Sequence, residues 1–350
     1  MKALRQRRIG VLERRTCTLN PGTTRPVKAI LCTRFGTADD LVLTDIAEPV
    51  AGPGEVVTTV KAIGLNFYDT LIVAGRYQKQ PPFPFSPGGE YAGVVESVGK
   101  GVSGFAAGDH VIGYVSYGAA RERMAAPADK LIKFEGNLEF ERAAALTIIY
   151  GTAMHGLRDR AALKRGETLA VLGAAGGVGL AAVELGKHMG ARVIACASTD
   201  EKCAFARAHG ADETVNYTTE DLRDALKRLG GERGIDVVFD PVGDRYSEPA
   251  LRAIAWGGRH LVVGFAAGEI PKLPLNLTLL KGCAVVGVYF GDWVRREPKI
   301  YHDTIVELAR LAADGKLSCH VDHAYSLAEF PQALKSLTER RAMGKVIVRP

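Results

Sequence analysis

One segment constrains the fold of this chain more than any other: the run LAVLGAAGGVGL from Leu169 to Leu180. An apolar strand leads into a glycine-rich turn and then into an apolar helix. The glycines let the backbone turn tightly and approach a pyrophosphate, and the start of the helix offers free N–H groups to phosphate oxygens. The first two glycines are one residue further apart than in the GxGxxG pattern. The segment predicts a dinucleotide site, with a plain strand–helix joint as the alternative.

Apolar strands and helical stretches alternate around this segment, from near Thr147 onwards. Such alternation predicts a parallel sheet covered by helices on both faces. Before it, short apolar runs separated by Gly and Pro predict a β-rich domain that begins at Val27. We expect strands at Thr168–Leu172, Arg192–Ala197, Ile235–Phe239, Arg259–Phe265, Ala284–Phe290 and Lys345–Arg349, and helices at Gly177–Met189, Glu201–His209, Ser247–Ala255 and Lys299–Ala313.

The net charge of +6 lies in residues 1–26, where the only acid is Glu13. We interpret this segment as a disordered basic leader, a solvated tail, with an organelle-targeting peptide as the alternative. Acidic and basic residues balance in the rest of the chain, which argues against nucleic-acid binding. No apolar run is long enough for membrane insertion, and there is no secretory signal, so we expect a cytoplasmic protein. The six cysteines form no CxxC pair and predict neither disulfides nor a zinc ribbon.

The end of the second strand distinguishes NAD from NADP. In NAD sites an Asp or Glu at this place accepts a hydrogen bond from the ribose 2′-hydroxyl. Here Ser198 stands at the strand end, and Lys202 follows one helical turn later. A hydroxyl and an ammonium group suit a 2′-phosphate, so the sequence favours NADPH. Two alternatives stay open: Asp200 or Glu201 replaces the missing carboxylate, or Ser198 caps a helix and Lys202 is solvated.

Four motifs together resemble the medium-chain dehydrogenase/reductase superfamily. They are the glycine-rich turn, GLNFYDT (64–70), PGGEYAG (87–93) and GDHV (108–111). Within the superfamily they are similar to the zinc-free quinone oxidoreductase branch, the zeta-crystallin-like proteins, over residues 27–349. The resemblance implies an α/β fold with a Rossmann-type parallel-sheet domain inserted in a β-rich GroES-like catalytic domain. We expect the NADP-binding domain at 149–290 and the catalytic domain at 27–148 and 291–350.

The zinc-dependent members of the superfamily differ from this chain at two positions. They carry Cys where this chain has Asn66 and His where it has Gly89. Asn and Gly do not supply the thiolate and imidazole that a catalytic zinc needs, and the four-cysteine lobe of the structural zinc is absent, so we expect no metal. The resemblance also implies a cleft between the domains and a homodimer joined through the edge strand Ala284–Phe290.

The resemblance further assigns the site residues. Asn66, Asp69 and Tyr77 are expected to be catalytic and to line the nicotinamide end of the cleft. NADPH is expected to contact Thr152, Gly173, Ala175, Gly176, Gly177, Val178, Gly179, Ser198, Lys202, Tyr217, Val242, Gly243, Phe265, Tyr289 and Lys345. Structural roles remain as alternatives: Asn66 could bond a turn, Tyr77 could be a core aromatic residue, and Lys345 could be a solvated charge on a strand.

The expected reaction is hydride transfer from NADPH to a quinone or to the β-carbon of an α,β-unsaturated carbonyl compound, an enone. Without zinc, no strong Lewis acid is available to activate an alcohol. One alternative is an enoyl-thioester or alkenal reductase on the same fold. A second is a non-catalytic NADPH-binding protein that binds RNA or serves a structural role, although the balanced charge after the leader argues against RNA.

Overall fold

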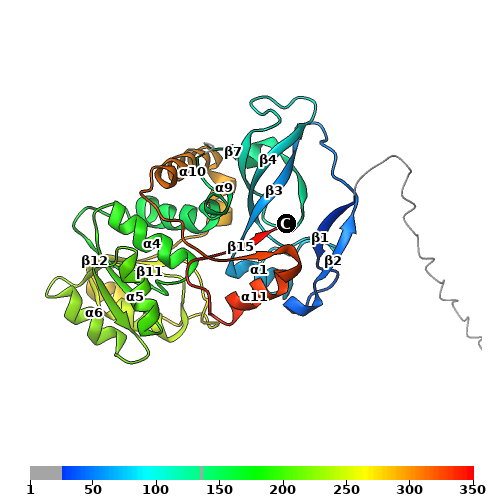
Figure 1. Cartoon of the computed structure of the whole chain (residues 1–350). Helices are drawn as coiled ribbons and strands as arrows, with labels where there is room; N and C mark the ends of the chain where they lie inside the picture. Colours follow the sequence, from blue (N-terminus) through cyan, green and yellow to red (C-terminus); the bar gives the residue numbers. More distant parts are fainter. Residues whose placement is uncertain (1–25, 135–136) are drawn as a thin grey trace, which may run out of the picture.

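The computed structural model describes residues 26–134 and 137–350, and the basic leader therefore lies outside the described residues. Two sheets lie side by side and each is the centre of one domain (Figure 1). The first residues of the described chain form β1 (Val27–Leu31), which pairs with β2 (Val42–Ile46) in a two-stranded sheet. Among the helices of the described residues, none combines the length and apolar character that a bilayer-crossing helix requires.

The β-rich domain contains a seven-stranded sheet that the end of the chain completes. The last strand pairs antiparallel with β3, so that Val348 lies opposite Ile63. This pairing explains why the C-terminal segment belongs to the first domain although the nucleotide domain separates them in sequence. The strands are β3 (Glu55–Leu65), β4 (Glu90–Val98), β5 (His110–Tyr114), β6 (Arg123–Pro127), β7 (Leu131–Lys133), β14 (Val321–Ser326) and β15 (Lys345–Arg349), with helices α1 (Phe67–Val73), α2 (Phe140–Ala143) and α11 (Phe330–Thr338).

The second domain is a six-stranded sheet in the order β10-β9-β8-β11-β12-β13, and each neighbouring pair is parallel. This is the order of a dinucleotide-binding sheet, whose ligands bind outside the carboxyl ends of the strands. The strands are β8 (Thr168–Leu172), β9 (Arg192–Ala197), β10 (Glu213–Asn216), β11 (Ile235–Asp240), β12 (Ile254–Val262) and β13 (Ala284–Gly287), and the helices are α4 (Gly177–His188), α5 (Asp200–Ala208), α6 (Leu222–Gly230), α7 (Ser247–Arg252) and α8 (Asn276–Lys281).

The fold class predicted from the sequence is confirmed, with two corrections to its strands and helices. The helix predicted at Ser247–Ala255 ends at Arg252, because β12 begins at Ile254 rather than Arg259; this strand also ends at Val262 rather than Phe265. In the sequence, the Gly257-Gly258 pair suggests that the strand is interrupted. The strand continues through this pair because Gly257 adopts a φ of 71° and the pairing with β11 shifts in register. The predicted edge strand ends at Gly287, since Tyr289 is the N-cap of α9 (Phe290–Arg296). The predicted domain bounds stay predictions.

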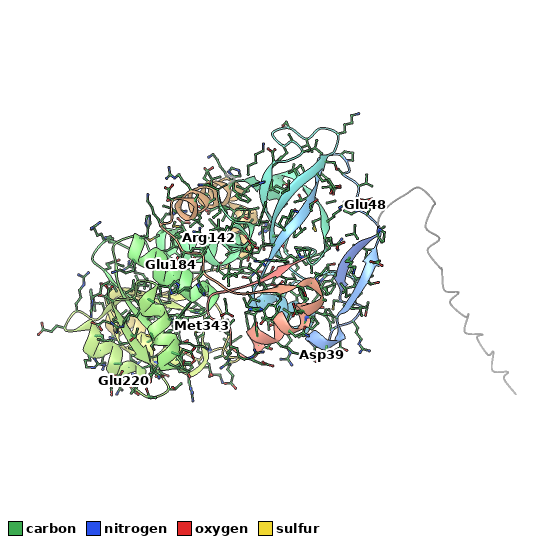
Figure 2. All side chains as sticks on the ribbon, in the orientation of Figure 1. Asp39, Glu48, Arg142, Glu184, Glu220 and Met343 are labelled. Atoms are coloured by element: carbon green, nitrogen blue, oxygen red, sulfur yellow. The ribbon has the colours of Figure 1, made fainter. Side chains whose placement is uncertain are left out.

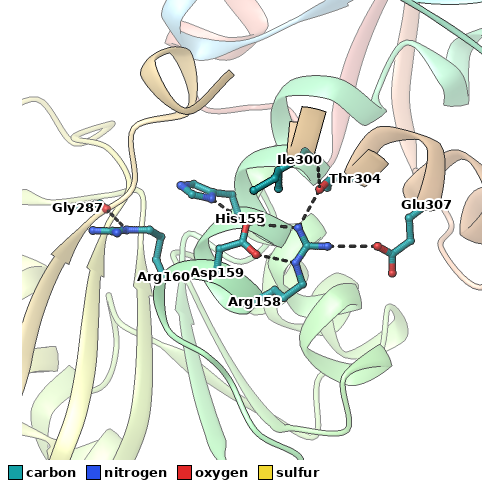
Figure 3. A network of polar contacts seen from close by, with 8 residues as sticks. All are labelled: His155, Arg158, Asp159, Arg160, Gly287, Ile300, Thr304 and Glu307. Atoms are coloured by element: carbon teal, nitrogen blue, oxygen red, sulfur yellow. Dashed lines mark hydrogen bonds and ion pairs between the residues drawn. The ribbon is translucent and has the colours of Figure 1, made fainter. Parts of the chain in front are cut away.

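A polar network fastens the chain that crosses between the domains (Figure 3). The crossing consists of π-helical turns on both sides of α3 (Gly151–Met154). Arg158 donates to Asp159, to Glu307 and to the Thr304 hydroxyl group, which lies on α10 (Pro298–Ala313). Arg160 donates to the carbonyl group of Gly287 at 3.1 Å. α10, which follows the nucleotide domain, is thereby tied to the helix that enters it.

Candidate functional site

The glycine-rich turn lies at the carboxyl end of β8, where the sequence predicts it. Gly173 has φ of 59°, and a Cβ atom on Gly179 would lie 2.2 Å from the Gly173 carbonyl oxygen, so only glycine allows this approach. Gly176 is the N-cap of α4 and has no side chain to cap the first N–H groups of the helix. Ala175, Gly177 and Val178 complete the turn. The cradle therefore fits a pyrophosphate, with the positive end of the helix directed at it.

The C-terminal segment touches this turn directly. The N–H group of Gly344 donates to the Ala175 carbonyl oxygen at 2.8 Å, and Gly344 forms an isolated parallel bridge with Gly176. Gly344 has φ of 91°, and a Cβ atom there would lie 2.8 Å from the His320 ring. The neighbouring Met343 lies between the two domains in Figure 2. Lys345 follows immediately and enters the other domain as the first residue of β15.

The end of β9 brings together the residues predicted for a 2′-phosphate. Thr199, not Ser198, is the N-cap of α5, and its hydroxyl accepts from the Lys202 N–H group at 3.2 Å, so the capping role considered for Ser198 is wrong. Tyr217 follows β10 and lies beside Ser198, and burial raises its pKa to about 12. The Asp200 carboxylate accepts a hydrogen bond from the Asn216 side-chain amide at 2.7 Å, which argues against Asp200 as a ribose ligand.

A second cation at this place was missed by the sequence reasoning. The Lys202 ammonium group donates to the Arg340 carbonyl oxygen at 2.6 Å, and the Arg340 guanidinium group donates to the carbonyl groups of Ala266 and Ala267. Burial lowers the pKa of Lys202 below its ordinary value, the charge of Arg340 adds to this shift, and Glu201 opposes it. Two cations held this close together suit a dianionic phosphate. The only sequence signal was the basic pair just before the predicted Met-Gly-Lys segment.

The turn after β11 holds Val242 and Gly243 through one buried carboxylate. Oδ1 of Asp240 accepts from the N–H groups of Val242 and Gly243 at 2.9 and 2.8 Å. Burial acts to raise the pKa of Asp240, but the hydrogen bond and charge of His260 hold it below its ordinary value. Gly243 has φ of 72°, and the Phe265 ring lies 2.8 Å from where its Cβ would stand. Three residues predicted to flank the nicotinamide are therefore brought together.

A buried network joins Asn66, Glu90, Thr147 and Lys345, which are at most 7 % exposed. The Lys345 ammonium group donates to Glu90 Oε1 at 2.5 Å and to Asn66 Oδ1 at 2.7 Å, and Asn66 Nδ2 donates to Glu90 Oε1 at 2.8 Å. Glu90 also accepts from the Thr147 hydroxyl group and from the Ile148 N–H group. The considered role of Lys345 as a solvated charge is therefore wrong. Asn66 Nδ2 donates to Glu90 and, at 3.4 Å, to the Gly64 carbonyl oxygen, so a hydrogen bond donated by this amide to the cofactor requires its rearrangement.

Asp69 lies beside this network with one oxygen unpaired. Its Oδ2 accepts from the Asn66 N–H group at 2.8 Å, whereas Oδ1 is buried and has no hydrogen-bond partner in the structure. Burial raises the pKa of Asp69 to about 7, although the Asn66 N–H group and the charge of Lys345 act in the other direction. A carboxyl group with this pKa changes its protonation near neutrality, which is a property common at functional sites.

Four tyrosines, which we call the phenol cluster, gather beside Gly89: Tyr68, Tyr77, Tyr114 and Tyr289. The rings of Tyr68 and Tyr77 lie 5.4 Å apart between centroids. Burial raises the pKa of Tyr77 above its ordinary value, and its neighbours Tyr289 and Tyr114 add to the shift. Tyr289 is 54 % exposed and begins α9, so this phenol reaches the cluster from the nucleotide domain. Tyr77 is partly buried against the core of the β-rich domain, so the alternative of a core aromatic residue with its hydroxyl group at the surface stays open.

Thr152, which is predicted to contact a phosphate, belongs to the helix at the crossing between the domains. It lies buried on α3, and its contact with a phosphate stays a prediction. In the described residues, no group of three or more His, Cys, Asp or Glu side chains could hold a metal ion. The positions that correspond to zinc ligands are occupied differently: Asn66 bonds Lys345, and Gly89 faces the Tyr68 hydroxyl group.

Comparisons with known proteins agree with this arrangement. Residues 52–136 match the family model of the alcohol dehydrogenase GroES-like domain, and residues 177–313 match that of the zinc-binding dehydrogenases. The chain is 35 % identical to quinone oxidoreductase-like protein 2 of Rattus norvegicus, over 93 % of each chain.

Two solved structures are similar throughout. Quinone oxidoreductase of Pseudomonas syringae pv. Tomato DC3000 has 33 % identity and a TM-score of 0.86, covering 93 % of this chain and 100 % of that one. Escherichia coli quinone oxidoreductase, solved as a complex with NADPH, has 29 % identity and a TM-score of 0.85, covering 92 % and 100 %. The chain therefore belongs to the medium-chain dehydrogenase/reductase family, in its quinone oxidoreductase branch.

Proposed function

We propose that this protein is an NADPH-dependent, zinc-independent reductase of quinones and enones. The observation that carries the proposal is the contrast between the two ends of the site. At the end of β9, Lys202 and Arg340 lie together and the Asp200 carboxylate is bonded to Asn216. Around Gly89, the Tyr68 phenol stands in place of a metal ligand. The relatives named quinone oxidoreductase, one of them solved with NADPH, support the same activity.

The nucleotide domain and the C-terminal segment supply the groups that would hold NADPH. The turn from Gly173 to Gly179 receives the pyrophosphate, and Lys202 and Arg340 receive the 2′-phosphate together with Ser198 and Tyr217. The Val242–Gly243 turn and Phe265 flank the nicotinamide. Two observations support the fit of the pyrophosphate to this turn. No side chain caps the start of α4, and the close approach of Gly179 to the Gly173 carbonyl oxygen leaves no room for a Cβ atom. When bound, NADPH supplies hydride to the acceptor.

The phenol cluster supplies hydrogen-bond donors for the acceptor. Negative charge develops on the acceptor oxygen as it is reduced, and a donor aimed at that oxygen stabilises it. Tyr77 keeps its proton at neutral pH, because its pKa lies above the ordinary value of a phenol. We therefore assign the donor role to Tyr77, with Tyr289 facing it. Asn66 and Asp69 act from the buried side, where Asp69 fixes the start of α1.

The test is a panel of acceptors, each measured by the loss of the absorbance of reduced nicotinamide as NADPH is oxidised. Benzoquinones, enones and an enoyl thioester are compared with a primary alcohol plus NADP⁺, each with and without EDTA. We expect turnover of quinones or enones that EDTA leaves unchanged, and no alcohol oxidation. Activity confined to the enoyl thioester would support the alternative reductase. Loss of activity with EDTA that zinc restores would contradict the proposal.

We further propose a homodimer formed through β13. This strand pairs with β12 on one side, and large apolar side chains lie exposed around it: Trp256, Leu275, Leu279, Leu280 and Val285. An apolar group of this kind next to a strand edge marks an association surface. Light scattering should give twice the mass of the chain, and Leu279→Glu with Leu280→Glu should halve it. A wild-type monomer would contradict the dimer. The cytoplasmic location stays a prediction.

A further inference from the structure

We propose that Tyr68, a residue outside the predicted set, determines which acceptors this protein reduces. Its hydroxyl group fills the space above Gly89 in the phenol cluster, so that only acceptors that are narrow beside the reacting carbonyl group fit. This inference rests on the proposed function, because it places the acceptor among the phenols.

The Tyr68 hydroxyl group lies nearest to the space above Gly89. A Cβ atom on Gly89 would lie 1.4 Å from the Tyr68 hydroxyl oxygen, 2.8 Å from its Cζ and 3.0 Å from the Ser116 carbonyl oxygen. The backbone of Gly89 does not adopt a positive φ, so the conformation itself does not require glycine. Glycine is required here because the phenol occupies the volume of any larger side chain.

The Tyr68 side chain is fixed from several directions. It begins on the first turn of α1, where the next residue, Asp69, holds the Asn66 N–H group. The Tyr68 hydroxyl group donates to the Ser116 carbonyl oxygen at 3.2 Å, and its ring packs on Tyr77. The side chain also packs against two apolar core clusters, one inside the β-rich domain and one that continues into the nucleotide domain. A side chain held in this way acts as a wall, because moving it would disturb contacts on each side.

This wall stands next to the group that would meet the acceptor. Tyr77 is the assigned donor, and Tyr114 and Tyr289 complete the cluster. In the zinc-dependent members that this chain resembles, a histidine stands at the position of Gly89 and binds the metal. Here the same space holds a rigid phenol, so substituents next to the acceptor carbonyl group have to pass its edge. Size discrimination by an apolar wall is worth ~10–200-fold per methyl-sized group.

The experiment compares kcat/KM for 1,4-benzoquinone and tetramethyl-1,4-benzoquinone in the wild type, Tyr68→Phe, Tyr68→Leu and Tyr68→Ala. We expect the ratio of bulky to small acceptor to rise at least about tenfold in Tyr68→Ala and Tyr68→Leu, and less in Tyr68→Phe, which keeps the ring. The dissociation constant of NADPH, from fluorescence titration, should stay unchanged. The matched control is Tyr325→Leu on β14, which should leave the ratio as in the wild type. A wild-type ratio in a folded Tyr68→Leu protein would overturn the proposal.

A second measurement separates failure of this inference from failure of the proposed function. The corresponding hydroquinones are bound at equilibrium by dialysis, which needs no turnover. If the wild type reduces neither quinones nor enones, the proposed function fails, and the size preference is then decided by whether Tyr68→Leu gains affinity for the tetramethyl compound. No gain would overturn the role of Tyr68 as well.

The contact itself is tested by a cycle with Gly89→Ala. In the wild type this substitution should lower Tm by about 2–10 °C, because overpacking costs ~1–3 kcal/mol. In a Tyr68→Ala background most of that loss should disappear. An equal loss in both backgrounds would show that Tyr68 does not fill the space above Gly89.

Discussion

The buried pair Glu90–Lys345 makes a prediction whose size follows from the structure. The two side chains are 0 and 1 % exposed, and the ammonium group lies 2.5 Å from Glu90 Oε1. Removing one member of such a pair leaves a charge without its partner and costs about 3–5 kcal/mol of unfolding free energy. Lys345→Met is the simplest perturbation, because methionine keeps the length and apolar volume of the lysine stem.

The two members are not equivalent, and the structure predicts which loss is larger. After Lys345→Met, the Glu90 carboxylate still accepts from Asn66 Nδ2, the Thr147 hydroxyl group and the Ile148 N–H group. Hydrogen bonds to a charged group contribute ~1.5–3 kcal/mol each, so this loss should lie near 3 kcal/mol. After Glu90→Leu, the ammonium group keeps Asn66 Oδ1 as its remaining partner, so the loss should reach about 5 kcal/mol.

Urea unfolding followed by tryptophan fluorescence measures both variants and the double variant. The double variant carries neither charge, so it should be more stable than Glu90→Leu, with a coupling of at least about 2 kcal/mol. The matched control is Lys335→Met, which breaks the exposed pair with Asp39 and should cost less than about 1 kcal/mol. Equal losses for Lys345→Met and Lys335→Met, or strictly additive losses in the double variant, would refute the reasoning.

Three further predictions concern the cofactor, the acceptor and pH. Lys202→Ala and Arg340→Ala should each weaken NADPH binding by about 1–3 kcal/mol and leave NADH binding nearly unchanged in a fluorescence titration; equal wild-type affinities for the two cofactors would contradict this. Tyr77→Phe should lower kcat about tenfold to a thousandfold with unchanged NADPH affinity, and full kcat on both quinones and enones would reduce Tyr77 to a wall. The pKa of Asp69 is raised to about 7, so its carboxyl group stays protonated up to that pH in the folded state but ionises near pH 4 in the unfolded state. The free energy of unfolding should therefore fall by up to about 4 kcal/mol as the pH rises from about 4 to 7. Asp69→Asn should remove that slope in urea titrations between these pH values, and an unchanged slope would assign it to other groups.

The nucleotide domain could be predicted from the sequence because its information is local. Strands β8 and β9 are buried on both faces and read as continuous apolar runs, and their predicted bounds agree with the structure. The turn between β8 and α4 needs glycine for reasons that neighbouring residues impose. The pattern was less reliable at the edge of the sheet, where β13 is mostly exposed and apolar residues continue into α9.

The parts that the sequence did not show depend on pairs far apart in the chain. Arg340 reaches Lys202 across 138 positions, and Lys345 reaches Glu90 across 255. A lysine at the start of an apolar strand has the same local pattern whether it is solvated or buried against a carboxylate. Local periodicity specifies which face of a strand is apolar, but it carries no information about which distant acid meets that face. The chemistry of this site therefore depends on how the returning C-terminal segment places Arg340, Gly344 and Lys345 against the two domains. A charged residue inside the final apolar strand is the sequence signal that such a closure leaves.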